Sequence, residues 1–445
     1  VCAVNAETEL ATQESTTPRG TEDVVLSGVL AELQWRGVIA QSTDLQELDR
    51  MLAAGPVYFY IGFDPTAPSL HVGSLVQLVT MRRLQEAGHI PVVLVGGSTG
   101  LIGDPRPTSE RNLHDRETVA GWVDSIAQQV RPFVHFEGEN AATVVNNLDW
   151  FGQLGALDFL RDVGKHFRVN QMLKKDAVSA RLESSQGISY TEFSYQILQG
   201  YDFWHLFTSL GVRLQVGGQD QWGNLMAGVD YVHRVEGESV HALTTPLVTE
   251  ASGRKFGKSE GNAIWLDASM TSPWTFYQFW LNAEDEKVVE YLRLFTLLDR
   301  EQIAELEREV AEAPFKRTAQ RALAREMTTL VHGAEITDGV EAAAEALFGK
   351  GDLQQVDPAV LLDATAELTG GEVEVGTSWV DVVVAVGFAD SRKVAKRLLG
   401  EGGISVNSQK VTDLEGAITD TDFIGGQVAV VKRGRKTLAA ARRAG

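Results

Sequence analysis

The clearest alternation of apolar and polar positions lies at residues 57–64. Every second side chain there is apolar, as expected for a strand with a buried face: Val57, Phe59, Ile61 and Phe63. Pro65 and Pro68 follow directly and cannot continue a strand. The pattern therefore predicts a strand that ends just before these prolines.

A helical pattern runs from about residue 70 to 87. Ser69 is placed to cap its start, and Gly88 is placed to close it. The apolar run at 91–95 predicts a second, buried strand. A strand, a helix and a strand in this order predict a parallel sheet with a right-handed crossover.

The remaining pattern divides the chain into regions of different character. Strand-like and helical segments alternate up to about residue 250, whereas 271–348 is helical, with clearly amphipathic stretches. The glycines at 370–371 and Pro358 indicate a partly ordered linker. We expect these parts: a disordered tail (1–23), a Rossmann-like α/β domain (24–250), a loop and an α-helical domain (251–349), a linker (350–376), and a small α+β domain (377–445).

Composition and charge limit the classes of function. One cysteine in 445 residues excludes an internal disulfide and suits a reducing compartment, so we expect a cytoplasmic protein. The net charge of −20 argues against general nucleic-acid binding. Residues 379–445, however, carry 11 Lys and Arg against 7 Asp and Glu. This imbalance favours a local, salt-sensitive contact with nucleic acid over indiscriminate binding.

Several polar residues follow the first predicted strand, where open parallel sheets bind their ligands. Asp64, Thr66, His71 and Gly73 lie there, and His71 is close to a helix N-terminus that suits phosphate. Gly73 lacks a side chain, so we expect a base or ribose to approach the backbone closely at this point.

A second group lies on the segment 190–205. Tyr195, Gln199 and Asp202 are spaced i, i+4 and i+7, which places them on one helix face. Such a stripe is more often a solvated face than a binding site.

Two motifs far apart in the sequence are weak alone and informative together. The upstream motif is His71-Val72-Gly73-Ser74, and the downstream one is Lys255-Phe256-Gly257-Lys258-Ser259. In this order, with the first opening a helix of a βαβ unit, they indicate a site that binds ATP and transfers its adenylyl group.

The segment 60–74 resembles the HIGH signature of the class I aminoacyl-tRNA synthetases, and 255–259 resembles their KMSKS loop. The strings at 96–105, 191–195 and 217–224 narrow the resemblance to the bacterial-type tyrosyl-tRNA synthetases, over roughly residues 25 to 445. The resemblance implies that Tyr60 and Asp202 hold the tyrosine hydroxyl. It also implies that the ammonium and carboxylate groups are held by Asp104, Tyr195, Gln199 and Gln221.

The resemblance further implies that ATP, with Mg²⁺, is a substrate and that the protein has no resident metal or cofactor. The implied catalytic residues are Thr66, His71, Lys255, Lys258, Ser259 and Arg111. The implied ATP-binding residues are Gly62, Asp64, His71, Gly73, Ser74, Gly218, Asp220 and Lys258. Four residues depart from the common pattern: Ser74 ends the first motif, Gly257 replaces a common serine, and Arg106 and Arg111 stand where many relatives carry a lysine.

The implied partners are tyrosine, ATP and tRNA(Tyr), together with a second copy of the chain through residues near 145–175, and no membrane. The implied RNA-binding residues are Arg161, Lys165, Arg392, Lys393, Lys396 and Arg397, of which the first two belong to a basic cluster at 161–175. The alternatives are a tryptophanyl-tRNA synthetase, a small-molecule nucleotidyltransferase and a non-catalytic RNA-binding paralogue. Tyr60 with Asp202 argues against the first, chain length against the second, and His71 with the loop lysines against the third.

Overall fold

The computed structural model describes most of the chain. The described residues are 25–106, 109–185, 187–254, 256–259, 262–349, 351–366, 368–434 and 437–444. Within these ranges the side chains of residues 258, 259 and 262 are not described.

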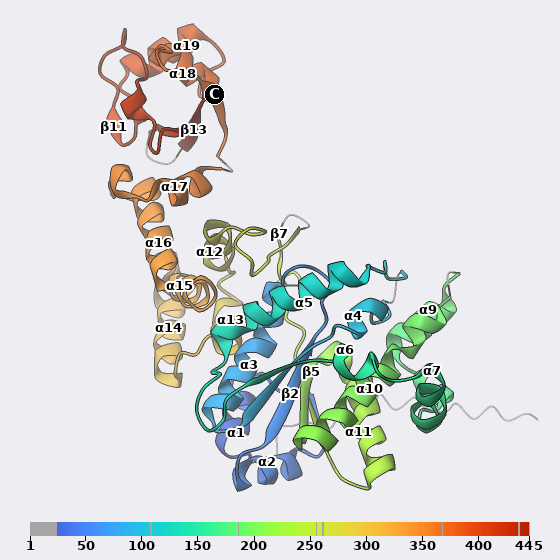
Figure 1. Cartoon of the computed structure of the whole chain (residues 1–445). Helices are drawn as coiled ribbons and strands as arrows, with labels where there is room; N and C mark the ends of the chain where they lie inside the picture. Colours follow the sequence, from blue (N-terminus) through green and yellow to red (C-terminus); the bar gives the residue numbers. More distant parts are fainter. Residues whose placement is uncertain are drawn as a thin grey trace, which may run out of the picture.

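Among the described residues, six strands form the central sheet, in the order β1-β6-β5-β2-β3-β4 (Figure 1). Their bounds are β1 Gln41–Ser42, β2 Tyr58–Phe63, β3 Ile90–Val95, β4 Thr143–Asn146, β5 Leu214–Gly218 and β6 His241–Thr245. All neighbours pair in parallel except β1 with β6. The prediction of a parallel α/β sheet is therefore confirmed.

Alternate residues of β2 serve two different cores. Phe59 and Ile61 pack into the large cluster that includes apolar residues of α3 and α5. Tyr60 faces the other way, and its ring meets Phe203 of α10 edge-on with centroids 5.3 Å apart. The strand is thus buried on both faces, as expected for a parallel sheet. Its second face leads toward a cavity.

The helices around this sheet have the following bounds: α1 Gly28–Trp35, α2 Leu45–Ala54, α3 Leu75–Glu86, α4 Thr99–Ile102, α5 Arg116–Val130, α6 Leu148–Phe151, α7 Ala156–Asp158, α8 Val169–Met172, α9 Asp176–Glu183, α10 Tyr190–Leu210 and α11 Trp222–Glu236. Short 3-10 and π segments are η2 Val72–Ser74, η3 Arg131–Phe133, η4 Phe159–Val163, η5 Gly164–His166 and η6 Gln219–Gln221.

The start of the helix after β2 differs from the prediction. His71, not Ser69, is the cap: its Nδ1 accepts a hydrogen bond from the backbone N–H of Gly73 at 3.0 Å and opens η2, which α3 follows. Ser69 is buried, and its hydroxyl accepts a hydrogen bond from the N–H of Asp267 at 3.1 Å. A tertiary contact 198 residues away thus replaces the local cap.

The helical domain packs beside the sheet domain. Its elements are α12 Pro273–Leu281, α13 Val288–Phe295, α14 Arg300–Glu312, η7 Pro314–Lys316, α15 Thr318–His332 and α16 Ala334–Phe348. Two buried arginines of the first domain, Arg36 and Arg83, donate hydrogen bonds to backbone carbonyls at residues 293–298, where α13 ends. Because these carbonyls lie at a helix C-terminus, cations are favourable partners for them.

The stretch 350–376, which we expected to be a linker, contains regular structure. It holds η8 Leu353–Gln355, α17 Pro358–Thr365 and β9 Gly370–Val373. Side chains at Gly370 and Gly371 would overlap the backbone carbonyls of Ala440 and Ala385 respectively. These glycines therefore permit close packing of backbones instead of forming a flexible hinge.

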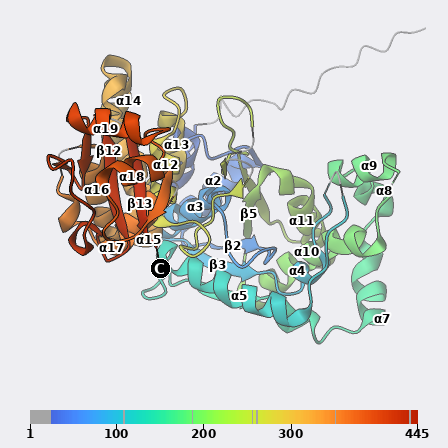
Figure 2. The ribbon, with the colours of Figure 1, turned by 90° about the horizontal axis from the view of Figure 1, so that it is seen from above.

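The C-terminal domain contains a second sheet, in the order β11-β10-β12-β13-β9. Its elements are α18 Trp379–Ala385, α19 Arg392–Gly400, β10 Ile404–Val406, β11 Gln409–Lys410, η9 Asp420–Asp422, β12 Val428–Arg433 and β13 Thr437–Arg443. Val430 and Ala440 of this sheet belong to the same core cluster as Leu361 of α17. Figure 2 shows this domain over the helical domain, on the side of the molecule away from α7, α8 and α9.

A membrane span would need a long, apolar helix. No helix in the described ranges is both long and apolar enough to cross a bilayer.

Candidate active site

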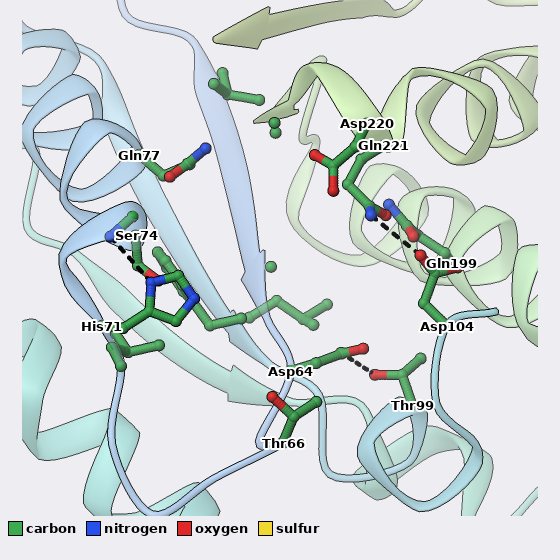
Figure 3. A pocket seen from close by; sticks show the side chains of 18 of the residues that line it. Asp64, Thr66, His71, Ser74, Gln77, Thr99, Asp104, Gln199, Asp220 and Gln221 are labelled. Carbon is green, nitrogen blue, oxygen red and sulfur yellow. Dashed lines mark hydrogen bonds between the residues drawn. The ribbon is translucent and has the colours of Figure 1, made fainter. Parts of the chain in front are cut away.

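A cavity of about 750 Å³ opens at the carboxyl ends of the parallel strands. Asp64 follows β2, Asp104 follows β3, and Asp220 follows β5. In Figure 3, His71, Ser74 and Gln77 face Asp104, Gln199, Asp220 and Gln221 across this space. This is the edge where open parallel sheets bind ligands.

At one end of the cavity lies Asp202, which is fully buried. Its Oδ2 accepts a hydrogen bond from Asn147 Nδ2 at 3.1 Å, and its Oδ1 accepts one from Trp150 Nε1 at 2.9 Å. Burial raises the pKa of this carboxyl to about 8, against the opposing effect of the two hydrogen bonds. The buried hydroxyl of Tyr60 makes no hydrogen bond with any described residue. A polar ligand group is therefore the natural partner of this end of the cavity.

Asp64 and Tyr195 form a buried pair next to this end. The Tyr195 hydroxyl donates to Asp64 Oδ2 at 2.6 Å, and the Thr99 hydroxyl donates to Asp64 Oδ1 at 2.7 Å. Burial raises the pKa of the Asp64 carboxyl. Because the Tyr195 O–H donates its hydrogen bond to Asp64, the oxygen lone pairs of Tyr195 are available to accept a hydrogen bond from a ligand. The buried Oε1 of Gln199 likewise lacks a partner among the described residues.

The carboxylate of Asp104 is held by three side chains. Lys175 Nζ lies 2.6 Å from Oδ1, Asn224 Nδ2 donates to the same oxygen at 3.2 Å, and Gln221 Nε2 donates to Oδ2 at 3.1 Å. Lys175 was expected in the basic surface cluster, and that expectation is wrong. Its side chain is only 8% exposed, and the partly buried carboxylate of Asp104 compensates its charge there.

His71 projects from the start of η2. Because its Nδ1 accepts the N–H of Gly73, the neutral ring carries its proton on Nε2, which is a donor suited to phosphate oxygens. A Cβ at Gly73 would lie 2.6 Å from the ring carbon Cε1 of His71. Gly73 therefore makes room for the histidine ring, whereas we had expected it to make room for a base or ribose.

The other predicted residues of this region also line the cavity. They are Gly62, Thr66, Ser74, Arg106, Arg111, Gly218, Asp220 and Gln221. Arg111 is fixed by a hydrogen bond from its Nε to the backbone carbonyl of Asp104 at 2.9 Å. Burial and the charge of Arg111 lower the pKa of Arg106, so the two guanidinium groups share one corner of the site. This corner is positively charged and suits an anion.

The downstream motif is described in part. Lys255 lies outside the described residues, and for Lys258 and Ser259 only the backbone, in strand β7 (Lys258–Ser259), is described. Phe256 is buried against four aromatic rings, those of Phe279, Trp280, Tyr291 and Phe295. Gly257 has φ +86°, and a Cβ there would meet Val72. The two motifs therefore lie in contact.

The predicted RNA-binding residues form two separate groups. Arg161 and Lys165 are exposed near α7, and Arg161 is paired with Asp162 at 2.8 Å. The other four lie exposed on α19, where Arg392 pairs with Asp381 at 2.9 Å. The structure does not bring the two groups together.

Sequence reasoning missed several residues that shape the site. Asn147 and Trp150 orient Asp202, Lys175 and Asn224 hold Asp104, and Thr99 holds Asp64. Asn224 and Thr99 belong to strings that suggested the family, but nothing in their spacing assigned them a partner. Asn147 and Trp150 follow β4 directly, so their place at a strand end was the available signal.

Two family models match the chain. The model described as tRNA synthetases class I (W and Y) matches residues 27–349. The model described as tyrosine--tRNA ligase SYY-like C-terminal domain matches residues 365–440.

Curated relatives agree with these models. A tyrosine--tRNA ligase from Streptomyces coelicolor is 56% identical over 416 residues, which cover 93% of this chain and 99% of the relative. One from Acidothermus cellulolyticus is 53% identical, covering 94% of this chain and 100% of the relative.

Solved structures show the same fold. The C-terminally truncated mitochondrial tyrosyl-tRNA synthetase of Aspergillus nidulans matches with a TM-score of 0.66 and 31% identity, over 72% of this chain and 94% of that one. The tryptophanyl-tRNA synthetase of Plasmodium falciparum matches at 16% identity with a TM-score of 0.53, over 69% of this chain and 85% of that one, which shows a shared fold alone. By the two family models and the curated relatives, this chain belongs to the tyrosine--tRNA ligase family of the class I aminoacyl-tRNA synthetases.

Proposed function

We propose that this cavity activates tyrosine with ATP and passes it to tRNA. In the first step the tyrosine carboxylate attacks the α-phosphorus of ATP, the bond to the β-phosphate oxygen breaks, and pyrophosphate leaves. In the second step a ribose hydroxyl of the terminal tRNA adenosine attacks the tyrosyl carbonyl, and AMP leaves. Neither step needs a protein nucleophile, so positioning and charge stabilisation supply the catalysis.

The phenol of tyrosine is assigned to the end of the cavity at Tyr60 and Asp202. The unpartnered Tyr60 hydroxyl and the buried carboxyl of Asp202 supply the polar atoms that a phenol needs. A ligand without the hydroxyl leaves these groups unpaired, at a cost of about 1–3 kcal/mol for each buried polar group. This end of the cavity thus favours tyrosine over phenylalanine.

The ammonium group is assigned to Asp104, Tyr195 and Gln199. Tyr195 presents oxygen lone pairs because its O–H donates a hydrogen bond to Asp64. Gln199 presents a buried Oε1 that has no partner among the described residues. Asp64, for which we expected a place on the nucleotide side, contributes by orienting Tyr195. Gln221 uses one amide N–H for Asp104 and keeps the other for the substrate carboxylate.

ATP, taken with Mg²⁺ as the substrate complex, is assigned to the opposite wall. Thr66, His71 and Arg111 are assigned to the phosphates on one side. The loop residues Lys255, Lys258 and Ser259 are assigned to the phosphates on the other side. The ribose lies against Gly218 and Asp220, beside the nucleotide-side residues Gly62, Gly73 and Ser74. Losing one donor that is aimed at the transition state costs about 2.7–4 kcal/mol of barrier.

We assign tRNA contacts to the two exposed basic groups on opposite parts of the molecule. Arg161 and Lys165 would meet the acceptor end, and the basic face of α19 would meet another part of the tRNA. Each such phosphate contact adds a salt-dependent term to binding.

We also propose a homodimer, a cytoplasmic location and, apart from the structured stretch 350–376, the domain limits given by the sequence. Support for a dimer comes from exposed apolar side chains on 156–172: Leu157, Leu160 and Val169 are 81%, 51% and 57% exposed. Apolar groups that gather on one surface are typical of an interface.

The observation that carries the proposal is the pairing of two carboxyl groups at two ends of one cavity, the buried Asp202 at the phenol end and the partly buried Asp104 at the ammonium end. The test is charging of bacterial tRNA(Tyr) with labelled tyrosine. We expect charging by the full chain and none by Asp202→Ala. Charging that survives this substitution unchanged contradicts the assignment of the phenol end.

A further inference from the structure

A buried ion pair lies behind the cavity, outside the set of residues assigned to substrates. Arg181 Nη2 and Glu192 Oε2 are 3.1 Å apart, and their side chains are 2% and 1% exposed. Arg181 belongs to α9 and Glu192 to the first turn of α10. Replacing a buried ion pair by apolar residues often leaves stability unchanged, so stability alone does not account for this pair. Its other contacts indicate its role.

Both members of the pair hold the backbone of one short segment of the cavity wall. Arg181 Nη1 donates to the carbonyl of Arg106 at 3.3 Å, and Glu192 Oε1 accepts the N–H of Arg111 at 3.1 Å. Arg181 Nε also donates to the carbonyl of Gly187 at 2.8 Å, which fixes the approach to α10. The pair therefore holds the backbone at Arg106 and at Arg111.

Arg111 in turn connects two parts of the site. Arg111 Nε donates to the carbonyl of Asp104, the residue assigned to the tyrosine ammonium. Gly103 has φ +81°, and a Cβ there would lie 2.9 Å from Arg111 Cγ, so the arginine side chain lies tightly over the backbone. A shift of the backbone at Arg111 would move its guanidinium group and the Asp104 carbonyl together.

We propose that Arg181 and Glu192 are positioning residues that set Arg111 at the pyrophosphate end of the cavity. The proposal rests on the assigned function, because it deepens the role given to Arg111. Neither residue lines the cavity, so both act through the backbone at Arg106 and at Arg111. Misplacement of an oriented group by about 1 Å costs up to about 10²-fold.

The test measures the KM for pyrophosphate in tyrosine-dependent exchange of pyrophosphate into ATP. Rates are normalised to active sites, titrated by the burst of tyrosyl-adenylate. Glu192→Gln keeps an acceptor but removes the charge. The double variant R181M/E192L removes both charges and is expected to fold, because apolar replacement of a buried pair is often neutral. Arg83→Met is the matched control, since this buried arginine donates hydrogen bonds to backbone carbonyls at 293–296 and does not line the cavity.

We expect the KM for pyrophosphate to rise about 10- to 100-fold in Glu192→Gln and in the double variant. In Arg83→Met we expect a lower melting temperature and an unchanged KM. In an Arg111→Gln background, Glu192→Gln is expected to add almost nothing, because the two changes act through one group.

Two results overturn the proposal. One is an unchanged KM for pyrophosphate in both pair variants. The other is that Glu192→Gln raises this KM by as large a factor in the Arg111→Gln background as in the parent chain. If Arg111→Gln alone leaves this KM unchanged, the assigned role of Arg111 fails and the positioning role fails with it. Tyrosine-dependent exchange by the parent chain would still stand in that case, so the two failures are distinguishable.

Discussion

The indole Nε1 of Trp150 donates a hydrogen bond to Oδ1 of Asp202 at 2.9 Å, at a site where the carboxyl is otherwise removed from water. With the hydrogen bond from Asn147, this contact favours the ionised carboxyl, but the effect of burial is larger and raises the pKa to about 8. In the folded protein Asp202 therefore keeps its proton up to about pH 8, whereas in the unfolded chain the same carboxyl loses it near its ordinary pKa of 3.8.

Asp202→Asn is expected to remove a pH dependence of stability. The pKa of Asp202 is raised in the folded protein, so its favourable contribution is complete below about pH 4 and is lost as pH rises toward about 8. The free energy of unfolding of the variant, relative to that of the parent, should thus increase from about pH 4 to about pH 8 and then level off. Urea unfolding midpoints from pH 5 to pH 9 measure this. A constant difference across the range contradicts the raised pKa.

His332 is expected to make the helical domain sensitive to acid. Its ring meets Phe276 edge-on with centroids 4.9 Å apart, and burial lowers its pKa to about 4. Because the folded pKa lies below the usual 6.5, stability is present above pH 6.5 and is lost as pH falls toward 4. The unfolding midpoint of His332→Gln should depend less on pH in this window than that of the parent. The midpoint of His233→Gln, at an exposed position, should keep the parent's pH dependence. Equal slopes in the two variants would rule this origin out.

Gly257→Ala is expected to slow tyrosine activation more than Gly253→Ala. Both glycines have positive φ, +86° and +78°, so alanine is strained at each by about 1–2 kcal/mol. Only at Gly257 would the new Cβ also collide with Val72, next to the His71 motif. Pre-steady-state formation of tyrosyl-adenylate measures the difference. Equal rates in the two variants would show that this contact does not matter for the loop.

Arg442 is expected to hold the C-terminal domain against α17. Its Nη2 donates to the carbonyls of Thr365, Ala366 and Leu368. Arg442→Ala should destabilise this contact by about 1–3 kcal/mol and speed amide exchange in β9. Arg443→Ala is the control, because Arg443 makes a surface pair with Asp420 that is worth about 0–1 kcal/mol. Unchanged exchange in Arg442→Ala would mean that apolar packing alone fixes the domain.

The sequence predicted those features that depend on local spacing. The alternation at 57–64 gave β2, and the i, i+4, i+7 spacing correctly placed Tyr195, Gln199 and Asp202 together on α10 facing the cavity. Helical and strand periodicity carry this information because they repeat over a few residues.

Features that depend on contacts between distant segments were not predictable. Lys175 looked like part of a surface cluster, yet it pairs with Asp104, 71 residues away. Glycines at 370–371 looked like part of a partly ordered linker, yet they allow backbones to pack closely. Gly73 was predicted to admit a base or ribose, yet a side chain there would meet the His71 ring. In each case the missing information was the identity of the tertiary partner.

The most direct test of the account is exchange of labelled pyrophosphate into ATP, measured with each of the twenty amino acids and without tRNA. We expect exchange with tyrosine alone, no exchange in Asp202→Ala and much slower exchange in Lys258→Ala. Exchange with tryptophan would contradict the roles assigned to Tyr60 and Asp202. Absence of exchange with every amino acid, from a folded sample, would contradict the activation step itself.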